Sequence, residues 1–103
     1  MRIPLIAGNW KMYKTIAETE RFFREFLPLV ASSTHTEIAV APPFTAISKA
    51  VELTRGTTVA VSAQDVHWAK EGAFTGEVSA AMLADAGCRF TIIGHSERRQ
   101  YFG

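Results

Sequence analysis

The strongest constraint on the fold is an alternation of short apolar runs with longer segments of helical periodicity. Between the runs, apolar residues recur every three or four positions, which is typical of amphipathic helices. The predicted order is βαβαβαβ in a single domain over residues 1–103. Strands that are apolar on both faces and separated by helices are typical of a parallel sheet with right-handed crossovers. The predicted strands are Ile3–Ala7, Ile38–Ala41, Val59–Ala63 and Phe90–Ile93.

Three helices are predicted between these strands. Thr15 and Glu18 form a capping box at the start of the first helix. Pro28, near the end of that helix, predicts a kink or a stop. The third helix covers about residues 77–86, with Glu77 in its first turn and Gly87 just beyond its end. The apolar faces of the first two helices are Ile16, Phe22, Phe23, Phe26, Leu27 and Val30, and Phe44, Ile47 and Val51.

Two architectures fit this order. A doubly wound open sheet binds ligands where its strand order reverses, and a β/α barrel binds them above the carboxyl ends of its strands. The first predicted strand is not followed by G-x-G-x-x-G, and G-x-x-x-x-G-K-[ST] does not occur in the sequence. The nucleotide-binding versions of the open sheet therefore lose support.

Charge and cysteine content exclude several classes of function. The 11 Lys and Arg residues are balanced by 10 Asp and Glu residues, so a nucleic-acid-binding surface is not expected. Cys88 is the single cysteine, which excludes an internal disulfide and a cysteine-based zinc site. No apolar run approaches the length of a membrane-spanning helix. We expect a soluble, cytoplasmic protein that does not contact a membrane.

The last predicted strand leads to a candidate catalytic residue. The run Phe90–Ile93 continues through Gly94 to His95, at the expected start of a helix. Free backbone N–H groups at a helix start disfavour the protonated form of a nearby imidazole. A neutral imidazole can donate a hydrogen bond to a substrate oxygen.

The first predicted strand leads to a candidate binding site. Strand alternation places Asn9 and Lys11 on one side and Trp10 on the other, where the indole can pack under helices. A neutral donor and a cation facing one small volume suit an anionic, oxygen-rich ligand.

A polar loop over residues 64–76 has a length that is typical of a functional segment or an interface. Trp68 and Phe74 are too apolar for a free loop tip. Taken alone, Thr75 is a candidate N-cap for the helix that follows.

Five motifs of this chain resemble, in order and spacing, those of the triosephosphate isomerase family, and the resemblance covers essentially the whole chain. They are Gly8-Asn9-Trp10-Lys11-Met12, Ala41-Pro42-Pro43-Phe44, Ser62-Ala63-Gln64-Asp65, residues 72–79 and residues 93–99.

The resemblance implies a (β/α)8 barrel that interconverts dihydroxyacetone phosphate and glyceraldehyde 3-phosphate through an enediolate, in glycolysis and gluconeogenesis. It implies neither a metal nor another cofactor. Such barrels have about 250 residues, so we expect only the first four strands and an incomplete domain. The family's glutamate base, its lid and its late phosphate loop have no counterpart in this sequence. A C-terminal half is therefore needed for a closed barrel, and we expect the isolated chain to be inactive.

The resemblance also assigns roles to residues. His95 corresponds to the electrophile that hydrogen-bonds the carbonyl and enediolate oxygens, and Lys11 to the cation that stabilises the intermediate and the substrate phosphate. Asn9 corresponds to a substrate-binding asparagine, and Glu97 to a catalytic glutamate near the site that is linked to proton relay.

In the family, the long loop inserts into a second subunit, which implies a homodimer for the complete enzyme. Thr75 corresponds to the residue that reaches the partner's active site. Phe74, Glu77 and Arg98 correspond to residues at the same interface.

One alternative from another class remains open. Four parallel strands would leave Ile3–Ala7 and Phe90–Ile93 as unpaired apolar edges, which are templates for association. The chain could then be a non-catalytic half-barrel scaffold that self-associates.

Overall fold

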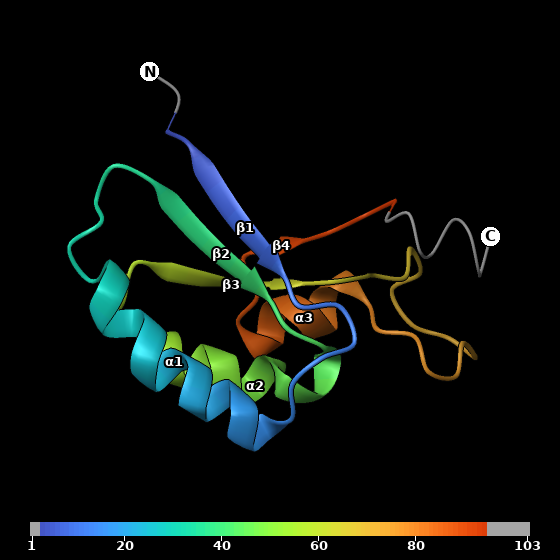
Figure 1. Ribbon diagram of the computed structural model, residues 1–103. Helices are drawn as coiled ribbons and strands as arrows, with labels where there is room; N and C mark the ends of the chain where they lie inside the picture. Colours follow the sequence, from blue (N-terminus) through green and yellow to red (C-terminus); the bar gives the residue numbers. More distant parts are fainter. Residues whose placement is uncertain (1–2, 95–103) are drawn as a thin grey trace.

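Four strands form one parallel sheet in the computed structural model, which describes residues 3–94. The strands pair in the order β1-β2-β3-β4, which is also their order along the chain. The three helices lie on one side of the sheet (Figure 1). The elements are β1 (Leu5–Asn9), α1 (Ile16–Val30), β2 (Glu37–Ala41), α2 (Phe44–Thr54), β3 (Val59–Ala63), α3 (Ala80–Ala86) and β4 (Phe90–Thr91).

This arrangement decides between the two architectures. A doubly wound sheet reverses its strand order and carries helices on both faces. Here each strand pairs with the next strand along the chain, without reversal. The described residues therefore form part of a β/α barrel, with four strands and the three helices between them.

β1 begins and ends two residues later than the predicted Ile3–Ala7. Its ladder with β2 continues through the pairs Gly8↔Val40 and Asn9↔Ala41. Ladder pairing depends on backbone N–H and C=O groups, so a glycine and a polar residue extend the strand beyond its apolar run.

The other strands lie close to their predicted positions. β3 has the predicted bounds, and β2 begins one residue earlier, at Glu37. β4 ends at Thr91 rather than at Ile93. Its partner β3 ends at Ala63, whose carbonyl accepts a hydrogen bond from the Ile92 N–H at 2.9 Å.

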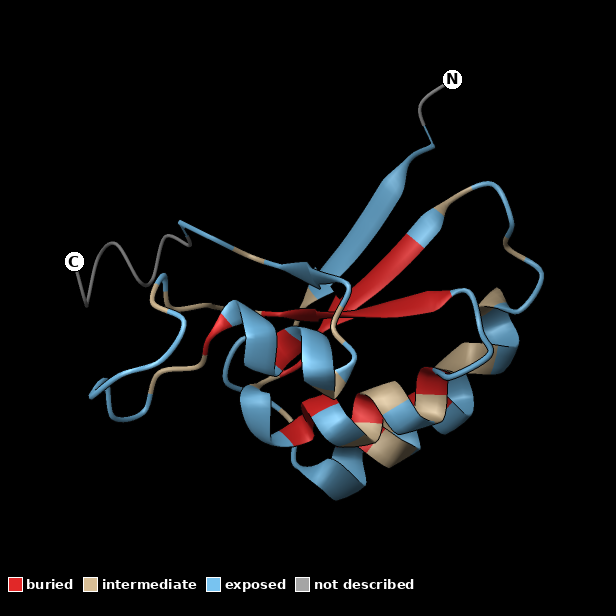
Figure 2. Cartoon of the chain, turned by 180° about the vertical axis from the view of Figure 1, so that it is seen from behind, coloured by how far each residue is buried: buried red, intermediate tan, exposed pale blue. Residues whose placement is uncertain are grey.

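The hydrophobic core lies between the helices and the two middle strands. Figure 2 shows β2 and β3 mostly buried and β1 exposed. On β1 the side chains of Leu5 and Ile6 are 51% and 63% exposed. The buried core residues are Phe23, Ile38, Val40, Ile47, Ala50, Val59, Val61, Ala63 and Leu83.

The capping box of α1 is confirmed. The Thr15 hydroxyl accepts a hydrogen bond from the Glu18 N–H at 3.2 Å, and Glu18 Oε1 accepts one from the Thr15 N–H at 3.0 Å. Hydrogen bonding from the Thr15 backbone to the Glu18 carboxyl, followed by that from the Thr15 side chain, lowers the pKa of this carboxyl. Pro28 does not stop the helix, which continues to Val30.

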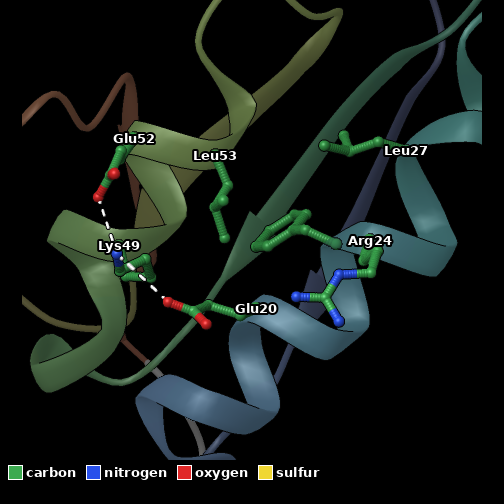
Figure 3. Close-up of a pocket in the computed structure, with 7 residues that line it drawn as sticks. Glu20, Arg24, Leu27, Lys49, Glu52 and Leu53 are labelled. Atoms are coloured by element: carbon green, nitrogen blue, oxygen red, sulfur yellow. Dashed lines mark ion pairs between the residues drawn. The ribbon is translucent and has the colours of Figure 1, made fainter.

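α1 and α2 pack side by side over the sheet and enclose a shallow groove. Lys49 Nζ lies 3.3 Å from Glu20 Oε1 and 3.0 Å from Glu52 Oε2 (Figure 3). The hydrogen bond to Glu52, followed by the one to Glu20, raises the pKa of the Lys49 ammonium. The partly exposed ion pairs contribute little to stability.

The predicted start of α3 is wrong. The helix begins at Ala80, and its N-cap is Ser79, whose hydroxyl accepts a hydrogen bond from the Met82 N–H at 3.2 Å. Glu77 is therefore not in the first turn, and Thr75 is not the N-cap. Ser79 has an extended backbone, pairs with His67 in an isolated parallel bridge and caps the helix, so the helix starts after it.

Gly87 ends α3 as predicted. It has a φ of 104°, and its N–H donates a hydrogen bond to the Ala84 carbonyl at 3.1 Å. A Cβ at this position would lie 2.6 Å from Val51 Cγ1 on α2. Both the left-handed backbone and the close approach to α2 therefore require glycine.

Candidate functional site at the carboxyl ends of the strands

The carboxyl ends of β1, β2 and β3 lie next to one another, because the strands are parallel and in register. Asn9 is the last residue of β1, Ala41 the last of β2, and Gln64 follows the last residue of β3. In a β/α barrel this edge carries the ligand site.

Asn9 and Lys11 are brought together, by a turn rather than by a continuing strand. β1 ends at Asn9, so strand alternation does not extend to Lys11. The Asn9 side-chain oxygen accepts a hydrogen bond from the Lys11 N–H at 2.9 Å. Lys11 has a φ of 55°, in the left-handed region. For a residue with a side chain this conformation costs about 1–2 kcal/mol, so the surrounding contacts must stabilise it.

Gln64 supplies a second contact to the Lys11 backbone. Its Nε2 donates one hydrogen bond to the Lys11 carbonyl and one to the Ala41 carbonyl, both at 2.8 Å. The Ala41 carbonyl also accepts the Trp10 N–H at 3.1 Å. The ends of the first three strands are thus joined through one amide group. No role for Gln64 was predicted from the sequence, although the residue lies directly after a strand, within the motif Ser62-Ala63-Gln64-Asp65.

Trp10 packs on α1, as predicted for its indole. The centroid of its ring lies 4.9 Å from that of Phe22, with an edge-to-face angle of 78°, and 5.7 Å from that of Phe23. Lys14 Nζ lies 5.5 Å from the centroids of both the Trp10 and the Phe22 rings. This cluster anchors the turn that contains Lys11 to the helical layer.

His95, Glu97 and Arg98 lie outside the described residues. The last described residue is Gly94, three residues beyond the end of β4, and it has a φ of 63°. The proposed roles of these three residues, and the expected helix start at the histidine, stay predictions.

The segment between β3 and α3 carries an aromatic cluster. The His67 ring centroid lies 5.5 Å from that of Trp68 and 4.3 Å from that of Phe74. His67 Nδ1 accepts a hydrogen bond from the Ala69 N–H at 3.1 Å. Trp68 remains 87% exposed and Phe74 42% exposed. The loop therefore presents a preformed apolar surface.

The other predicted interface residues lie in the same segment. Thr75 is exposed, and Glu77 is half-buried. The Glu77 N–H donates a hydrogen bond to the Phe74 carbonyl at 2.9 Å, which closes a tight turn around Thr75.

Residues 3–94 contain neither a group of metal-binding side chains nor a membrane-spanning helix. Within that range, no group of three or more His, Cys, Asp and Glu side chains is placed to hold a metal ion. No helix in the same range combines the length and the apolar character needed to cross a bilayer.

The comparisons with known proteins agree with this geometry. The family model described as triosephosphate isomerase matches residues 4–103. The chain belongs to the triosephosphate isomerase family. Triosephosphate isomerase from Solibacter usitatus is 63% identical over 102 residues, and the match covers 99% of this chain and 41% of that relative. Triosephosphate isomerase from Trichlorobacter lovleyi is 57% identical over 103 residues, which cover 100% of this chain and 41% of the relative.

A solved structure supports the same family at the level of the fold. The crystal structure of triosephosphate isomerase from Bartonella henselae matches with a TM-score of 0.90 and 36% identity, over 98% of this chain and 41% of that chain. The prediction of a triosephosphate isomerase type of barrel is confirmed. The chain spans about two fifths of the length of these isomerases.

Proposed function

We propose that this chain supplies the N-terminal half of a (β/α)8 isomerase that interconverts dihydroxyacetone phosphate and glyceraldehyde 3-phosphate through an enediolate. The enzyme would act in glycolysis and gluconeogenesis in the cytoplasm. The observation that carries the proposal is the turn that joins Asn9 to Lys11 at the carboxyl end of β1. It supports the proposal because both residues follow β1 at the edge where β/α barrels bind their substrates, in a chain whose residues 4–103 match this family.

The reaction divides into tasks that fit these side chains. The Lys11 ammonium would stabilise negative charge on the substrate phosphate and on the enediolate. Asn9 would bind the substrate beside it. His95 would donate a hydrogen bond to the carbonyl oxygen and to the enediolate oxygens, with Glu97 nearby.

Proton abstraction beside a carbonyl also requires a base. The family's glutamate base, lid and late phosphate loop have no counterpart in this sequence, so we assign them to a C-terminal half. The exposed Leu5 and Ile6 side chains on β1 support this assignment, because a closed barrel would cover them. The chain by itself is expected to give no useful turnover.

The complete enzyme is proposed to be a homodimer. Phe74, Thr75 and Glu77 lie in the segment between β3 and α3, and Arg98 would join them at the interface. The exposure of Trp68 beside the ordered His67 and Phe74 rings supports this surface as the contact. Burial of Trp68 and Phe74 against a partner would remove a large apolar area from water.

The test is a chimeric enzyme in which this chain replaces the matching segment of the Solibacter usitatus isomerase, to which it is 63% identical. It is produced in a host that lacks its own triosephosphate isomerase, and turnover of glyceraldehyde 3-phosphate is measured. We expect an active dimer. A folded, dimeric chimera without isomerase activity would contradict the proposal.

The exposed β1 side chains also favour one second candidate, a non-catalytic half-barrel that self-associates. Sedimentation of the 103-residue chain, with and without the remaining segment of the relative, separates the two. A complex of one chain with one complementing segment, with turnover, supports the isomerase. A stable oligomer of the chain that does not bind the added segment supports the non-catalytic half-barrel.

A further inference from the structure

We propose that Gln64 is a positioning residue for Lys11, and that it acts on the reaction by fixing the backbone from which the lysine side chain extends. The inference rests on the proposed function, in which Lys11 contacts the substrate. It adds a residue that follows β3 to a proposed site whose other residues follow β1 and β4 along the chain.

The first support is the completeness of the hydrogen bonding. A glutamine amide nitrogen carries two N–H groups. Gln64 Nε2 reaches two carbonyl oxygens at 2.8 Å, those of Lys11 and Ala41. Both of its N–H donors are therefore used on backbone atoms of two other strand ends.

The second support is the conformation that these bonds hold. Lys11 has a φ of 55°, which a residue with a side chain adopts only when its surroundings fix it. Its N–H is bound by Asn9 Oδ1 at 2.9 Å, and its carbonyl is bound by Gln64. Two side chains thus hold both backbone polar groups of this one residue.

The third support is the rigidity of the anchor. The Ala41 carbonyl accepts both the Gln64 side-chain amide and the Trp10 N–H. Gln64 is therefore tied to the end of β2 while it holds Lys11, and Trp10 is fixed against Phe22 on α1. Loss of the Gln64 amide would remove the hydrogen bond to the Lys11 carbonyl. Of the two side-chain bonds to the Lys11 backbone, only the one from the Lys11 N–H to Asn9 would then remain.

The consequence follows from the sensitivity of catalysis to geometry. A displacement of about 1 Å in a positioned group can cost about a hundredfold in rate. Gln64→Met keeps the length of the side chain and removes both donors. In the chimeric enzyme it is expected to lower kcat/KM about ten- to hundredfold.

A double-mutant cycle with Lys11→Ala distinguishes positioning from a general structural role. If Gln64 acts through Lys11, Gln64→Met has less than about a twofold effect on kcat/KM once the lysine side chain is absent. Equal effects in both backgrounds would overturn the proposal. If Lys11→Ala itself leaves kcat/KM unchanged, the role of Lys11 in the proposed function fails first, and this inference fails with it.

Thr57→Val is the matched control at the other end of β3. The Thr57 hydroxyl donates to the Thr54 carbonyl at 2.6 Å and accepts from the Val59 N–H at 3.2 Å. Its loss is expected to lower Tm and leave kcat/KM within about twofold. A Gln64→Met enzyme that shows the same pattern, a lower Tm with unchanged kcat and KM, would overturn the proposal.

Gln64→Glu keeps the proposal testable if the methionine variant does not fold. Its neutral carboxyl can donate one hydrogen bond to a carbonyl, and its carboxylate can donate none. The kcat/KM of this variant, divided by that of the parent at each pH, is expected to fall as pH rises through the pKa of the new carboxyl. A ratio that stays near one at every pH would overturn the proposal.

Discussion

The Asn9 side-chain oxygen accepts a hydrogen bond from the backbone N–H of Lys11 at 2.9 Å. The amide oxygen therefore stabilises the turn, while the amide nitrogen of the same side chain is the group that we propose donates to a substrate oxygen. The structural bond and the proposed substrate contact thus involve different atoms of Asn9, so substitutions can separate them.

We predict different effects for Asn9→Asp and Asn9→Ala in the chimeric enzyme. The aspartate keeps the acceptor for the Lys11 N–H, so its free energy of unfolding should stay within about 0.5 kcal/mol of the parent, whereas alanine should lose about 1 kcal/mol. Both variants lose the donor, so both should raise KM. Denaturant unfolding and steady-state kinetics measure the two effects. Equal stability of the two variants would contradict the assigned role of the oxygen.

Ser79→Ala is predicted to destabilise the protein by about 1 kcal/mol, because the hydroxyl caps α3 through the Met82 N–H. Thr75→Ala is the control, since the threonine caps no helix. Denaturant unfolding of the two chimeric variants tests the start of α3. A larger loss for Thr75→Ala in a dissociated, monomeric sample would show that the helix begins earlier.

Gly87→Ala is predicted to be strongly destabilising. It adds left-handed strain of about 1–2 kcal/mol and overpacking of about 1–3 kcal/mol, because the new Cβ would lie 2.6 Å from Val51 Cγ1. Gly56→Ala is the matched control, with a φ of 79° and no atom within 4 Å of its Cβ, so it should incur the strain alone.

A second substitution tests the contact itself. Val51→Ala removes the methyl groups that the new Cβ would meet, so it should recover part of the loss in the Gly87→Ala background. Denaturant unfolding of the double variant measures this recovery. Equal destabilisation by Gly87→Ala and Gly56→Ala would contradict the close contact between Gly87 and Val51.

Glu18 is predicted to make the free energy of unfolding depend on pH in the acid range. Its hydrogen bonds with Thr15 lower its pKa in the folded state below the ordinary value of 4.5. The stabilisation is therefore fully present above the unfolded pKa and is lost as pH falls through the lower, folded pKa. In Glu18→Gln this acid-dependent part should be absent. A difference in stability between parent and Glu18→Gln that is the same at neutral and strongly acid pH would contradict the capping box.

The order of strands and helices was accessible from the sequence, because apolar periodicity reports which faces are buried. The apolar run Val59–Ala63 and the capping residues Thr15 and Glu18 therefore predicted a strand and a helix start correctly. The ends of strands were harder to predict, because β1 extends to Asn9 by backbone pairing with Ala41 and not because its residues are apolar.

Two further features depend on tertiary contacts that no local pattern reports. Ser79, the N-cap of α3, pairs with His67 across the segment between β3 and α3, a contact that the periodicity around residues 77–86 does not report. Gln64 reaches a carbonyl 53 residues away. Asn9 and Lys11 could thus be proposed as site residues from the sequence. The turn at Lys11, and the hydrogen bonds by which Asn9 and Gln64 hold its backbone, required the structure.

The most direct test of the central claim compares Lys11→Ala with Lys14→Ala in the chimeric enzyme. Both remove a cation at a positive φ from one short turn, but only Lys11 is proposed to face the substrate. The account predicts that Lys11→Ala lowers kcat/KM by at least about a hundredfold through lost charge stabilisation, and that Lys14→Ala stays within about threefold of the parent. A Lys11→Ala enzyme as active as the parent would contradict the account.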